Sequence, residues 1–433
     1  MKKARRICLL PLNRRFISTT IVILVAFYAF YTNILRQTRN RYTYKTQSSI
    51  FDSASLNASV KVISSIMQLN RYLRNRTLFI DPRFISKIQS VPAHLIDDSK
   101  LRIGEESLSG ILEPNAVMMA FFDRDRLDIQ HLLRKHNLSW EVCADQNFEI
   151  FVNGICHRLI LFKPSKSEDY IEFVLRKVRR IIPKFPIAQY EGQQNETLAG
   201  PANWTTFVWT LRHSRFISCR KDSAVRVRKT YPQLFSEEPQ IKNEVILTLR
   251  RFRNWAIERG MTPMLYAGTL LGWYRECGII PYTHDIDFVV FIEEYYDRLP
   301  KDIINSSFMK LSVRFNKPED LLEYKVYIED SIPMDIFFLY HNQKISWVGG
   351  LHRSTKYRFI YPFINRTCSS DLLGYLMYVP CNALNVIVSE HGKNWLKPLH
   401  SSKYEWNKSP LNIRNAGTIP PDETAESFVH YNS

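Results

Sequence analysis

The stretch Ile279-Ile-Pro-Tyr-Thr-His-Asp-Ile-Asp-Phe-Val-Val-Phe-Ile292 places two aspartates at the start of an alternating apolar segment. Alternation predicts a β-strand, in which residues two apart point to the same face, so we expect Asp285 and Asp287 to project side by side. Two adjacent carboxylates ionise together at low cost only when a cation lies between them, and such oxygen ligands suit Mg²⁺ or Mn²⁺. The stretch predicts a divalent-metal site. D-x-D pairs are common, however, so the pair alone leaves a role without metal equally open.

Two further segments flank this pair in an informative order. Upstream, Gly268-Thr-Leu-Leu-Gly272 predicts a glycine-containing loop, and downstream Pro333-Met-Asp-Ile-Phe-Phe-Leu339 predicts another strand. Asp335 is the only charge in its apolar run, and an isolated carboxylate there is costly unless it is paired or binds metal. The alternative is that Asp335 caps a strand. A loop, a D-x-D pair and a third acid, in this order, are the layout of the nucleotidyltransferase superfamily, in which the loop holds phosphate and the acids hold metal.

The sequence around these residues resembles one family of that superfamily, the LicD/fukutin-type transferases. The resemblance covers roughly residues 240 to 430. It departs from many LicD sequences at Thr283 and His284, where those carry further acids, so we expect His284 to lie near the site or at the surface rather than to accept a proton. The matching features, in chain order, are Gly268-Thr-Leu-Leu-Gly272, Arg275, Ile280-Pro281, Asp285-Ile-Asp287, Trp347-Val-Gly-Gly350, Cys368, Val379-Pro-Cys381, Gly392-Lys-Asn-Trp395, Trp406-Asn-Lys-Ser-Pro410, Asn412 and Gly417.

The resemblance implies a fold and an activity. The fold is α/β (α+β), with a C-terminal nucleotidyltransferase-like catalytic domain built on a mixed sheet. The activity is transfer of an alditol phosphate, ribitol 5-phosphate in the fukutin-type branch, from a CDP-activated donor such as CDP-ribitol to a glycan hydroxyl in protein O-mannosyl glycosylation. Some LicD relatives transfer phosphocholine instead, which is the alternative substrate. The expected cofactor is Mg²⁺ or Mn²⁺.

The same resemblance implies roles for individual residues. Asp285 and Asp287 would bind a metal ion that bridges the donor diphosphate, and Asp335 would complete the metal site or accept the proton of the attacking hydroxyl. Arg275 would neutralise charge on the departing CMP, unless it is a solvated surface residue. Cys368 and Cys381 would form a disulfide, unless they are two buried thiols. The residues expected to bind the donor are Gly268, Thr269, Gly272 and Arg275. Three residues of the tail would contact donor base or glycan, or pack in the core: Lys393, Trp395 and Trp406.

Two other classes of function stay open. A Golgi scaffold or chaperone for other glycosyltransferases would keep the fold without turnover, yet it needs no cluster of costly carboxylates. A D-x-D sugar transferase would use a nucleotide sugar, yet it needs no Gly-Thr-Leu-Leu-Gly segment upstream. The expected partners are a glycoprotein glycan, the Golgi membrane, and either other glycosyltransferases or a second copy of the chain, but not nucleic acid.

Charge and hydropathy predict the topology. The chain has 433 residues and a net charge of +17, and ten basic residues precede its first acid, Asp52. Beyond them the basic excess is only seven, which argues against nucleic-acid binding. Residues 16–35 carry no charge, and about 20 such residues span a bilayer. Its densest apolar run, residues 21–31, ends in Tyr28, Phe30 and Tyr31 rather than in small residues, which favours an uncleaved anchor over a signal peptide. Six basic residues precede it, so we expect a cytoplasmic N-terminus.

Sequons and cysteines favour a secretory compartment. An even number of cysteines, six, follows the anchor, as in proteins of oxidising compartments. Eight N-x-S/T sequons also follow it, where chance predicts about three. With the family resemblance, this predicts a single-pass type II protein of the Golgi membrane whose catalytic domain is lumenal. The sequon residues are Asn57, Asn75, Asn137, Asn195, Asn203, Asn305, Asn365 and Asn407.

The expected organisation has five parts. They are a cytoplasmic tail (1–15), an anchor (16–35), a stem (36–59), an N-terminal lumenal mixed α/β domain (60–238) and a catalytic domain (239–433). Within the last two parts, the local patterns predict helices over 125–134, 169–182 and 241–259, and a β-hairpin of 148–152 and 158–162 around Asn153-Gly154.

Overall fold

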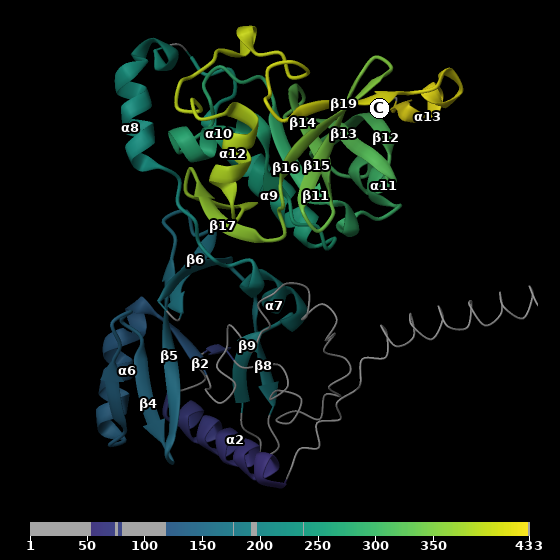
Figure 1. Cartoon of the computed structure of the whole chain (residues 1–433). Helices are drawn as coiled ribbons and strands as arrows, with labels where there is room; N and C mark the ends of the chain where they lie inside the picture. The colour runs from purple at the N-terminus through teal and green to yellow at the C-terminus, as the bar shows by residue number, and fades with distance from the viewer. Residues whose placement is uncertain are drawn as a thin grey trace, which may run out of the picture. The chain divides into compact units, whose positions relative to one another are not determined.

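The computed structural model describes residues 53–73, 77–79, 118–175, 177–191, 197–236 and 238–431 (Figure 1). The expected cytoplasmic tail, the membrane anchor and the first part of the stem lie outside these residues. Within them, no helix is both long enough and apolar enough to cross a membrane. The chain divides into two compact units, Met1–Lys61 and Val62–Ser433, and both sheets described below belong to the second.

The first sheet mixes parallel and antiparallel strand pairs. Within the described residues it has nine strands, and its main path runs β3-β4-β5-β2-β1-β9-β8. β6 pairs with both β5 and β7. The strands are β1 (Thr77–Phe79), β2 (Met118–Phe122), β3 (Ser139–Val142), β4 (Phe148–Val152), β5 (Ile155–Pro164), β6 (Tyr170–Leu175), β7 (Val178–Pro183), β8 (Ile187–Glu191) and β9 (Thr197–Pro201).

Successive side chains of the central strands point to opposite faces of this sheet, so a hydrophobic core forms on each face. Met119 and Phe121 of β2 join a cluster with apolar residues of helices α2 (Ser53–Leu73) and α6 (Arg126–Lys135). Ala120, between them, joins a second cluster with residues of α7 (Trp204–Arg212). Figure 1 shows α6 lying along β4. Helices therefore cover both faces.

β6 and β7 lie where a helix over 169–182 was expected, so that prediction is wrong. β6 and β7 pair antiparallel around a turn in which Lys177 has a φ of 61°. Ile171, Phe173 and Leu175 of β6 all join the core that contains α7. These apolar residues repeat every second position, and this period outweighed the basic residues that had suggested the polar face of a helix.

Three other local predictions are confirmed. Asn153 and Gly154 form the hairpin turn between β4 and β5, with φ angles of 52° and 76°. α6 occupies the helix expected over 125–134. α9 (Ile246–Ile257) occupies the centre of the helix expected over 241–259, and Gly260 follows with a φ of 77°, which glycine adopts without strain.

The second sheet is mixed, as expected for the catalytic domain. Within the described residues it has eleven strands on the path β17-β18-β10-β11-β14-β13-β12-β20, while β15 pairs with β14, β16 with β15, and β19 with β16. The strands are β10 (Met264–Leu265), β11 (Ile286–Phe291), β12 (Met309–Lys317), β13 (Asp320–Ile328), β14 (Ile332–His341), β15 (Ile345–His352), β16 (Thr355–Pro362), β17 (Thr367–Leu372), β18 (Tyr375–Pro380), β19 (Ile413–Thr418) and β20 (Phe428–His430). The accompanying helices besides α9 are α8 (Lys221–Thr230), α10 (Ala267–Glu276), α11 (Leu299–Ile304), α12 (Ala383–His391) and α13 (Thr424–Ser427).

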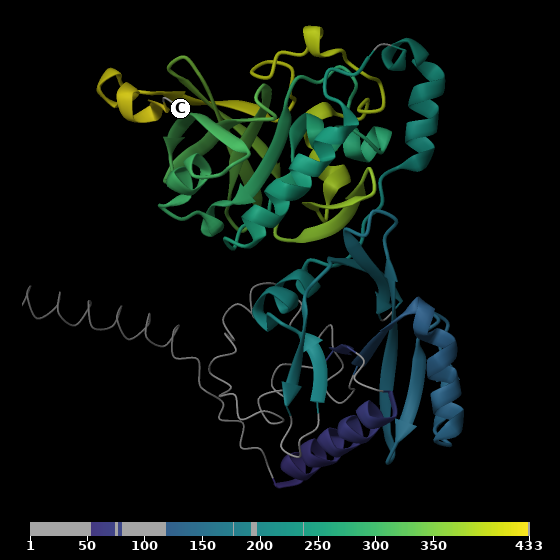
Figure 2. The same ribbon diagram turned by 180° about the vertical axis from the view of Figure 1, so that it is seen from behind.

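Two central strands of this sheet, β11 and β14, run parallel to each other. Both are largely buried, as is usual for parallel strands covered by helices. Phe252 of α9 packs against Phe288 of β11, with ring centroids 4.9 Å apart. α9 lies across the face of the sheet that Figure 2 presents, and α10 and α12 lie side by side in Figure 1. These helices hold the start of β11 at a fixed position.

A buried ion pair joins elements of the two sheets. Asp169, directly before β6, accepts a hydrogen bond from Arg253 Nη1 at 2.6 Å and one from the Leu376 amide at 2.8 Å. Arg253, on α9, also donates to the Leu376 carbonyl at 2.7 Å. Only 1% of each charged side chain is exposed. The pair therefore ties β6, α9 and β18 together at one point.

Candidate active site

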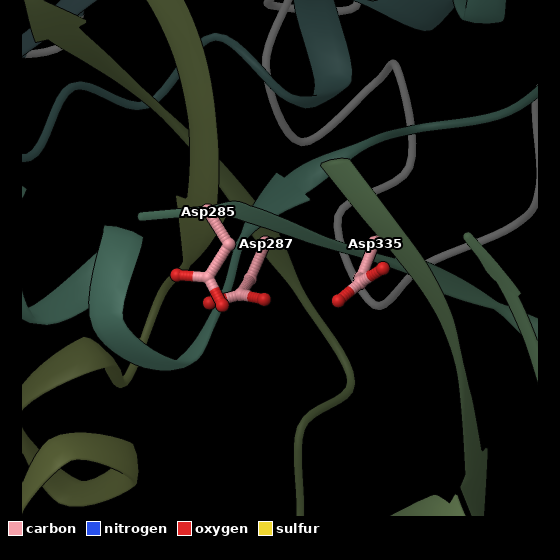
Figure 3. Close-up of side chains that lie close together, drawn as sticks. All are labelled: Asp285, Asp287 and Asp335. Carbon is pink, nitrogen blue, oxygen red and sulfur yellow. The ribbon is translucent and has the colours of Figure 1, made fainter. Parts of the chain in front are cut away.

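The three aspartates singled out by the sequence meet beside the central parallel strands. Asp287 on β11 and Asp335 on β14 are direct register partners, and Asp285 immediately precedes β11. One oxygen from each carboxylate lies within 4.8 Å of the other two. Figure 3 shows the three carboxylates on the same side of the two strands. Their expected convergence is confirmed, while metal binding stays a prediction.

Burial makes this cluster unfavourable without a cation. Asp287 is 8% exposed and Asp335 is 6% exposed. Burial first, and then the charges of Asp285, Asp335 and Glu390, raise the pKa of Asp287 well above its usual range. Burial also raises the pKa of Asp335 to about 6, against the opposing influence of Lys325. Because close like charges disfavour ionisation, a divalent ion among them would stabilise the site.

A lysine from the neighbouring strand shares the site. Lys325 on β13 is the cross-strand partner of Asp335, and its Nζ donates to Oδ2 of that carboxylate at 3.1 Å. The other oxygen, Oδ1, is buried and has no hydrogen-bond partner among the described residues. The salt bridge thus occupies one oxygen of Asp335 and leaves one open. A buried acceptor left without a partner costs roughly 1–3 kcal/mol, which a bound cation would offset.

The donor set fits a small divalent cation. All three ligands are carboxylates, the oxygen donors that Mg²⁺ and Mn²⁺ prefer. One oxygen from each carboxylate lies within 4.8 Å of the other two, so side-chain movements could bring all three to one small cation. Gly268 lies next to the cluster, since a Cβ built on it would be 3.9 Å from Asp287 Oδ2. The residues present therefore fit the metal that the resemblance implies.

The segment expected to be a phosphate-binding loop is the start of a helix. α10 begins at Ala267, whose φ of 42° turns the chain out of β10. The Asp287 amide donates to the Thr269 hydroxyl at 2.9 Å, and the Tyr266 amide donates to the Asp287 carbonyl at 3.0 Å. These bonds fix the helix start beside the aspartates. The amides of a helix's first turn lack partners within the helix and favour anions.

Two of the expected donor-binding residues have other contacts. Thr269 is engaged with Asp287, as described above. Gly272 packs closely within the fold, because a Cβ there would be 2.9 Å from the Gly278 carbonyl oxygen. Neither residue lines the cavity beside the aspartates, whereas Gly268 and Arg275 do. We therefore keep Gly268 and Arg275 as the donor-binding candidates.

Arg275 is buried, which removes the alternative of a solvated surface position. Only 2% of the residue is exposed. It donates to Glu276 Oε1 at 2.6 Å, to the Trp395 carbonyl at 3.2 Å and to the Tyr282 hydroxyl at 3.4 Å. A guanidinium held in this way is a fixed hydrogen-bond donor in the cavity wall, and the buried Glu276 carboxylate balances its charge.

The aspartates line a cavity of about 840 Å³, a size typical of sites for small molecules. Its cationic wall residues within the described part of the chain are Arg275, Lys325 and Lys397. His284 also lines the cavity and is exposed, in agreement with its expected place near the site. Wall residues from β12, β15, β16 and the segment after Tyr404 are mainly aromatic or apolar, including Phe315, Leu351, Phe359 and Trp406.

Two further acids in the wall were missed by sequence reasoning. Glu390 on α12 accepts hydrogen bonds from the Tyr361 hydroxyl at 2.7 Å and the Tyr404 hydroxyl at 3.2 Å. Glu323 on β13 is 8% exposed. Glu323 interrupts the apolar stretch Leu321-Leu-Glu-Tyr324, the same signal that singled out Asp335, and could have been found in this way. Glu390 lies near a helix end next to a histidine and carries no such signal.

The structure contains two disulfides within the described residues. Cys368–Cys381 confirms the expected pair and joins β17 to the residue after β18. Cys219–Cys277 joins residues 58 apart and was not predicted. Cys277 directly follows α10, so this bond fixes the end of the helix whose start faces the aspartates.

Most described sequon residues are accessible. Asn407 is half-buried, Asn57 lies in α2, and Asn75 and Asn195 lie outside the described residues. Glycosylation of these positions stays a prediction. The exposed sequon residues are Asn137, Asn203, Asn305 and Asn365.

Two aspartates at the start of one strand, a third on its parallel neighbour and a helix start beside them define a nucleotidyltransferase-type domain. Residues 260–382 match the family model described as LicD/FKTN/FKRP, nucleotidyltransferase domain. The chain belongs to this family, and within it the chain is fukutin-like.

Similarity over about three quarters of the chain and similarity to named transferases come from different relatives. An uncharacterised protein of Caenorhabditis elegans is 30% identical over 349 residues, 76% of this chain and 79% of that protein. The ribitol-5-phosphate transferase FKTN of Homo sapiens is 32% identical over 230 residues, 52% of this chain and 49% of that protein, so this match spans about half of each. Among solved structures, the Megavirus polyadenylate synthase aligns at 8% identity and a TM-score of 0.18, covering 78% of this chain and 66% of that one, which supports no inference.

Proposed function

We propose that this protein transfers an alditol phosphate, ribitol 5-phosphate first among candidates, from a CDP-activated donor to a glycan hydroxyl and requires Mg²⁺ or Mn²⁺. The observation that carries the proposal is the convergence of three carboxylates within 4.8 Å in the wall of a cavity with cationic residues. Similarity to the ribitol-5-phosphate transferase FKTN supports the choice of ribitol phosphate.

Different cavity residues would bind different parts of the donor. Asp285, Asp287 and Asp335 would hold the divalent ion, which would neutralise charge on the donor diphosphate. Gly268, at the start of α10, allows a phosphate to approach the helix amides without obstruction by a side chain. Arg275 would face the phosphate of the departing CMP, because its hydrogen bonds fix it in the cavity wall.

In the proposed reaction, the acceptor hydroxyl oxygen attacks the phosphorus that carries the alditol. The new P–O bond joins the alditol phosphate to the glycan while the bond to the CMP oxygen breaks, and CMP leaves with the electron pair. The hydroxyl proton passes to a cavity carboxylate. Asp335 Oδ1, which has no partner among the described residues, is open either to this proton or to the metal ion.

We also propose that the protein acts in protein glycosylation as a single-pass type II protein of the Golgi membrane. The two disulfides and the exposed sequons support a secretory compartment. The uncharged segment 16–35 supports the anchor. Glycosidase digestion of protein expressed in animal cells should lower its apparent mass, and an unchanged mass would contradict lumenal placement.

A donor panel tests the proposed activity. Purified protein is incubated with CDP-ribitol, CDP-choline or a nucleotide sugar and a glycopeptide acceptor, and released nucleotide and product mass are measured. We expect CMP release with CDP-ribitol, its loss in EDTA and its recovery with Mg²⁺ or Mn²⁺. CDP-choline turnover would establish the phosphocholine alternative, and nucleotide-sugar turnover a sugar transferase. Folded protein inactive with every donor would leave the scaffold alternative.

A matched pair of variants separates the site from the fold. Asp287→Asn should abolish CMP release while leaving the protein folded. Asp422→Asn, at an exposed position outside the cavity, should retain full activity. Equal activity of both variants would contradict the assigned metal site.

A further inference from the structure

Trp406 is a tryptophan of the cavity wall whose side chain is partly exposed. It lines the same cavity as the three aspartates, yet 40% of it is exposed. Tryptophans usually bury most of their surface, so an indole held open in a cavity is available to a ligand. Tyr404, two residues earlier, donates its hydroxyl to Glu390 and lines the same cavity. One short segment therefore contributes both Tyr404 and Trp406 to the cavity wall.

Aromatic neighbours fix the indole in place. The rings of Tyr357 and His352 meet it edge-on at centroid distances of 5.8 and 6.1 Å, and Phe359 lies 6.3 Å away. Such pairs contribute packing energy beyond the area that they bury. The exposed ring is thus preorganised, and little side-chain entropy is lost when a ligand covers it.

Gly350 on β15 gives the indole its position. A Cβ built on Gly350 would be 2.9 Å from Trp406 Cζ3 and 3.1 Å from Phe359 Cε2. The backbone of Gly350 is not in the left-handed region, so the position needs glycine for its missing side chain rather than for its conformation. Any other residue there would push the indole away from the strand.

The wall around Trp406 differs in chemistry from the wall around Arg275. Its other lining residues include Leu351, His352, Phe359 and Ser409, and none of these four has a permanent charge. An apolar ring surface with a few hydroxyl and imidazole groups suits a pyranose, which presents C–H groups on its face and hydroxyls at its rim. It does not suit a phosphate, which the cationic wall attracts.

We propose that Trp406, with His352 and Ser409, forms a subsite for an uncharged hexopyranose of the acceptor glycan. This inference rests on the proposed function, since the subsite would present the acceptor hydroxyl to the donor phosphate held at the carboxylates. Trp406 acts here as a substrate-binding residue, and Gly350 as a positioning residue.

Binding and kinetics together test the subsite. Saturation-transfer NMR uses methyl α-mannoside, methyl N-acetyl-β-glucosaminide and an O-mannosylated threonine peptide, without donor, on the wild type and on Trp406→Ala, Trp406→Phe and Leu411→Ala. The last variant is the matched control, because Leu411 is 63% exposed in the same segment and does not line the cavity. We expect glycan signals with the wild type, their loss in Trp406→Ala, partial retention in Trp406→Phe and no change in Leu411→Ala.

The kinetic arm measures the Michaelis constants for acceptor and donor separately. Trp406→Ala and Gly350→Ala should raise the acceptor constant by about tenfold and leave the donor constant within about twofold. Unchanged glycan signals and acceptor constant in Trp406→Ala would overturn the subsite while the transferase proposal stands. Glycan signals that depend on Trp406 in a protein inactive with every CDP donor would support the subsite and defeat the proposed reaction instead.

Discussion

Lys325 and Asp335 are direct cross-strand partners joined by a 3.1 Å salt bridge within a cluster of three aspartates. The lysine is the one positive side chain in hydrogen-bond contact with these three among the described residues. It lowers the repulsion of the metal-free cluster, and it occupies an oxygen that a metal ion would otherwise share. Lys325 and a divalent cation therefore compete for the same negative charge.

Removal of this lysine should strengthen metal binding. Lys325→Met takes away a unit charge within a few ångströms of the site, and a change of about 1 kcal/mol corresponds to about fivefold in affinity. We expect the dissociation constant for Mn²⁺, measured by electron paramagnetic resonance, to fall at least about fivefold. Lys325→Arg, which keeps the charge, should bind Mn²⁺ like the wild type. Weaker binding by the methionine variant would show that Lys325 supports the metal rather than competing with it.

Neutralising Asp287 should stabilise the metal-free protein. Its carboxylate is buried among like charges, which raise its pKa, so Asp287→Asn removes repulsion. In EDTA the melting temperature of the variant should exceed that of the wild type by about 2–4 °C. Adding Mg²⁺ should raise the wild-type value, because a ligand stabilises the state that it binds, and should leave the variant unchanged. Asp422→Asn should behave like the wild type in both conditions, and a common response of all three proteins would contradict the prediction.

The buried pair of Asp169 and Arg253 should be required for stability. Asp169→Ala leaves a fully buried guanidinium without its carboxylate, which typically costs about 3–5 kcal/mol. Urea unfolding should show this loss, and Arg253→Met added to Asp169→Ala should recover part of it. Asp222→Ala, which breaks an exposed pair with Arg220, should change little. Equal effects of the two alanine variants would show that burial of the ion pair is unimportant.

Glu294 should make stability depend on pH between about 4.5 and 7. Burial raises its pKa to about 7 in the folded protein, while the Thr262 amide and hydroxyl donate to it. Because the folded-state pKa lies above the unfolded one, this stabilisation is complete below about pH 4.5 and is lost as the pH rises to 7. The full loss amounts to roughly 3 kcal/mol.

The variant Glu294→Gln tests whether Glu294 causes this pH dependence of stability. Glutamine keeps an acceptor for the Thr262 amide and a donor for its hydroxyl, and it does not titrate. The free energy of unfolding of the variant should therefore vary less between pH 4.5 and 7 than that of the wild type. Parallel pH profiles for the two proteins would assign the dependence to other groups.

Local sequence patterns were sufficient to predict an element where the apolar residues followed a single repeat. β11 and β14 combine apolar side chains with isolated acids, and the Asn153-Gly154 turn needs two residues that accept positive φ, so these elements were predictable. The segment 169–182 was not, because basic residues interspersed with apolar ones fit a helix as well as a hairpin. The start of α10 was also not predictable, because its glycines suggested a loop. In the structure Gly272 allows close packing, and Gly268 leaves access to the helix amides open.

The amino-acid sequence by itself determined the family, the three aspartates and one disulfide, because these are carried by residue type and order along the chain. Only the tertiary structure decided that Lys325, Glu390 and Trp406 share the cavity with those aspartates, and that Cys219 bonds Cys277. Strand register brings Lys325 to Asp335, and packing of α12 and of the segment after it brings Glu390 and Trp406 to the same wall. Such contacts depend on how distant elements pack together, a property that no local pattern encodes.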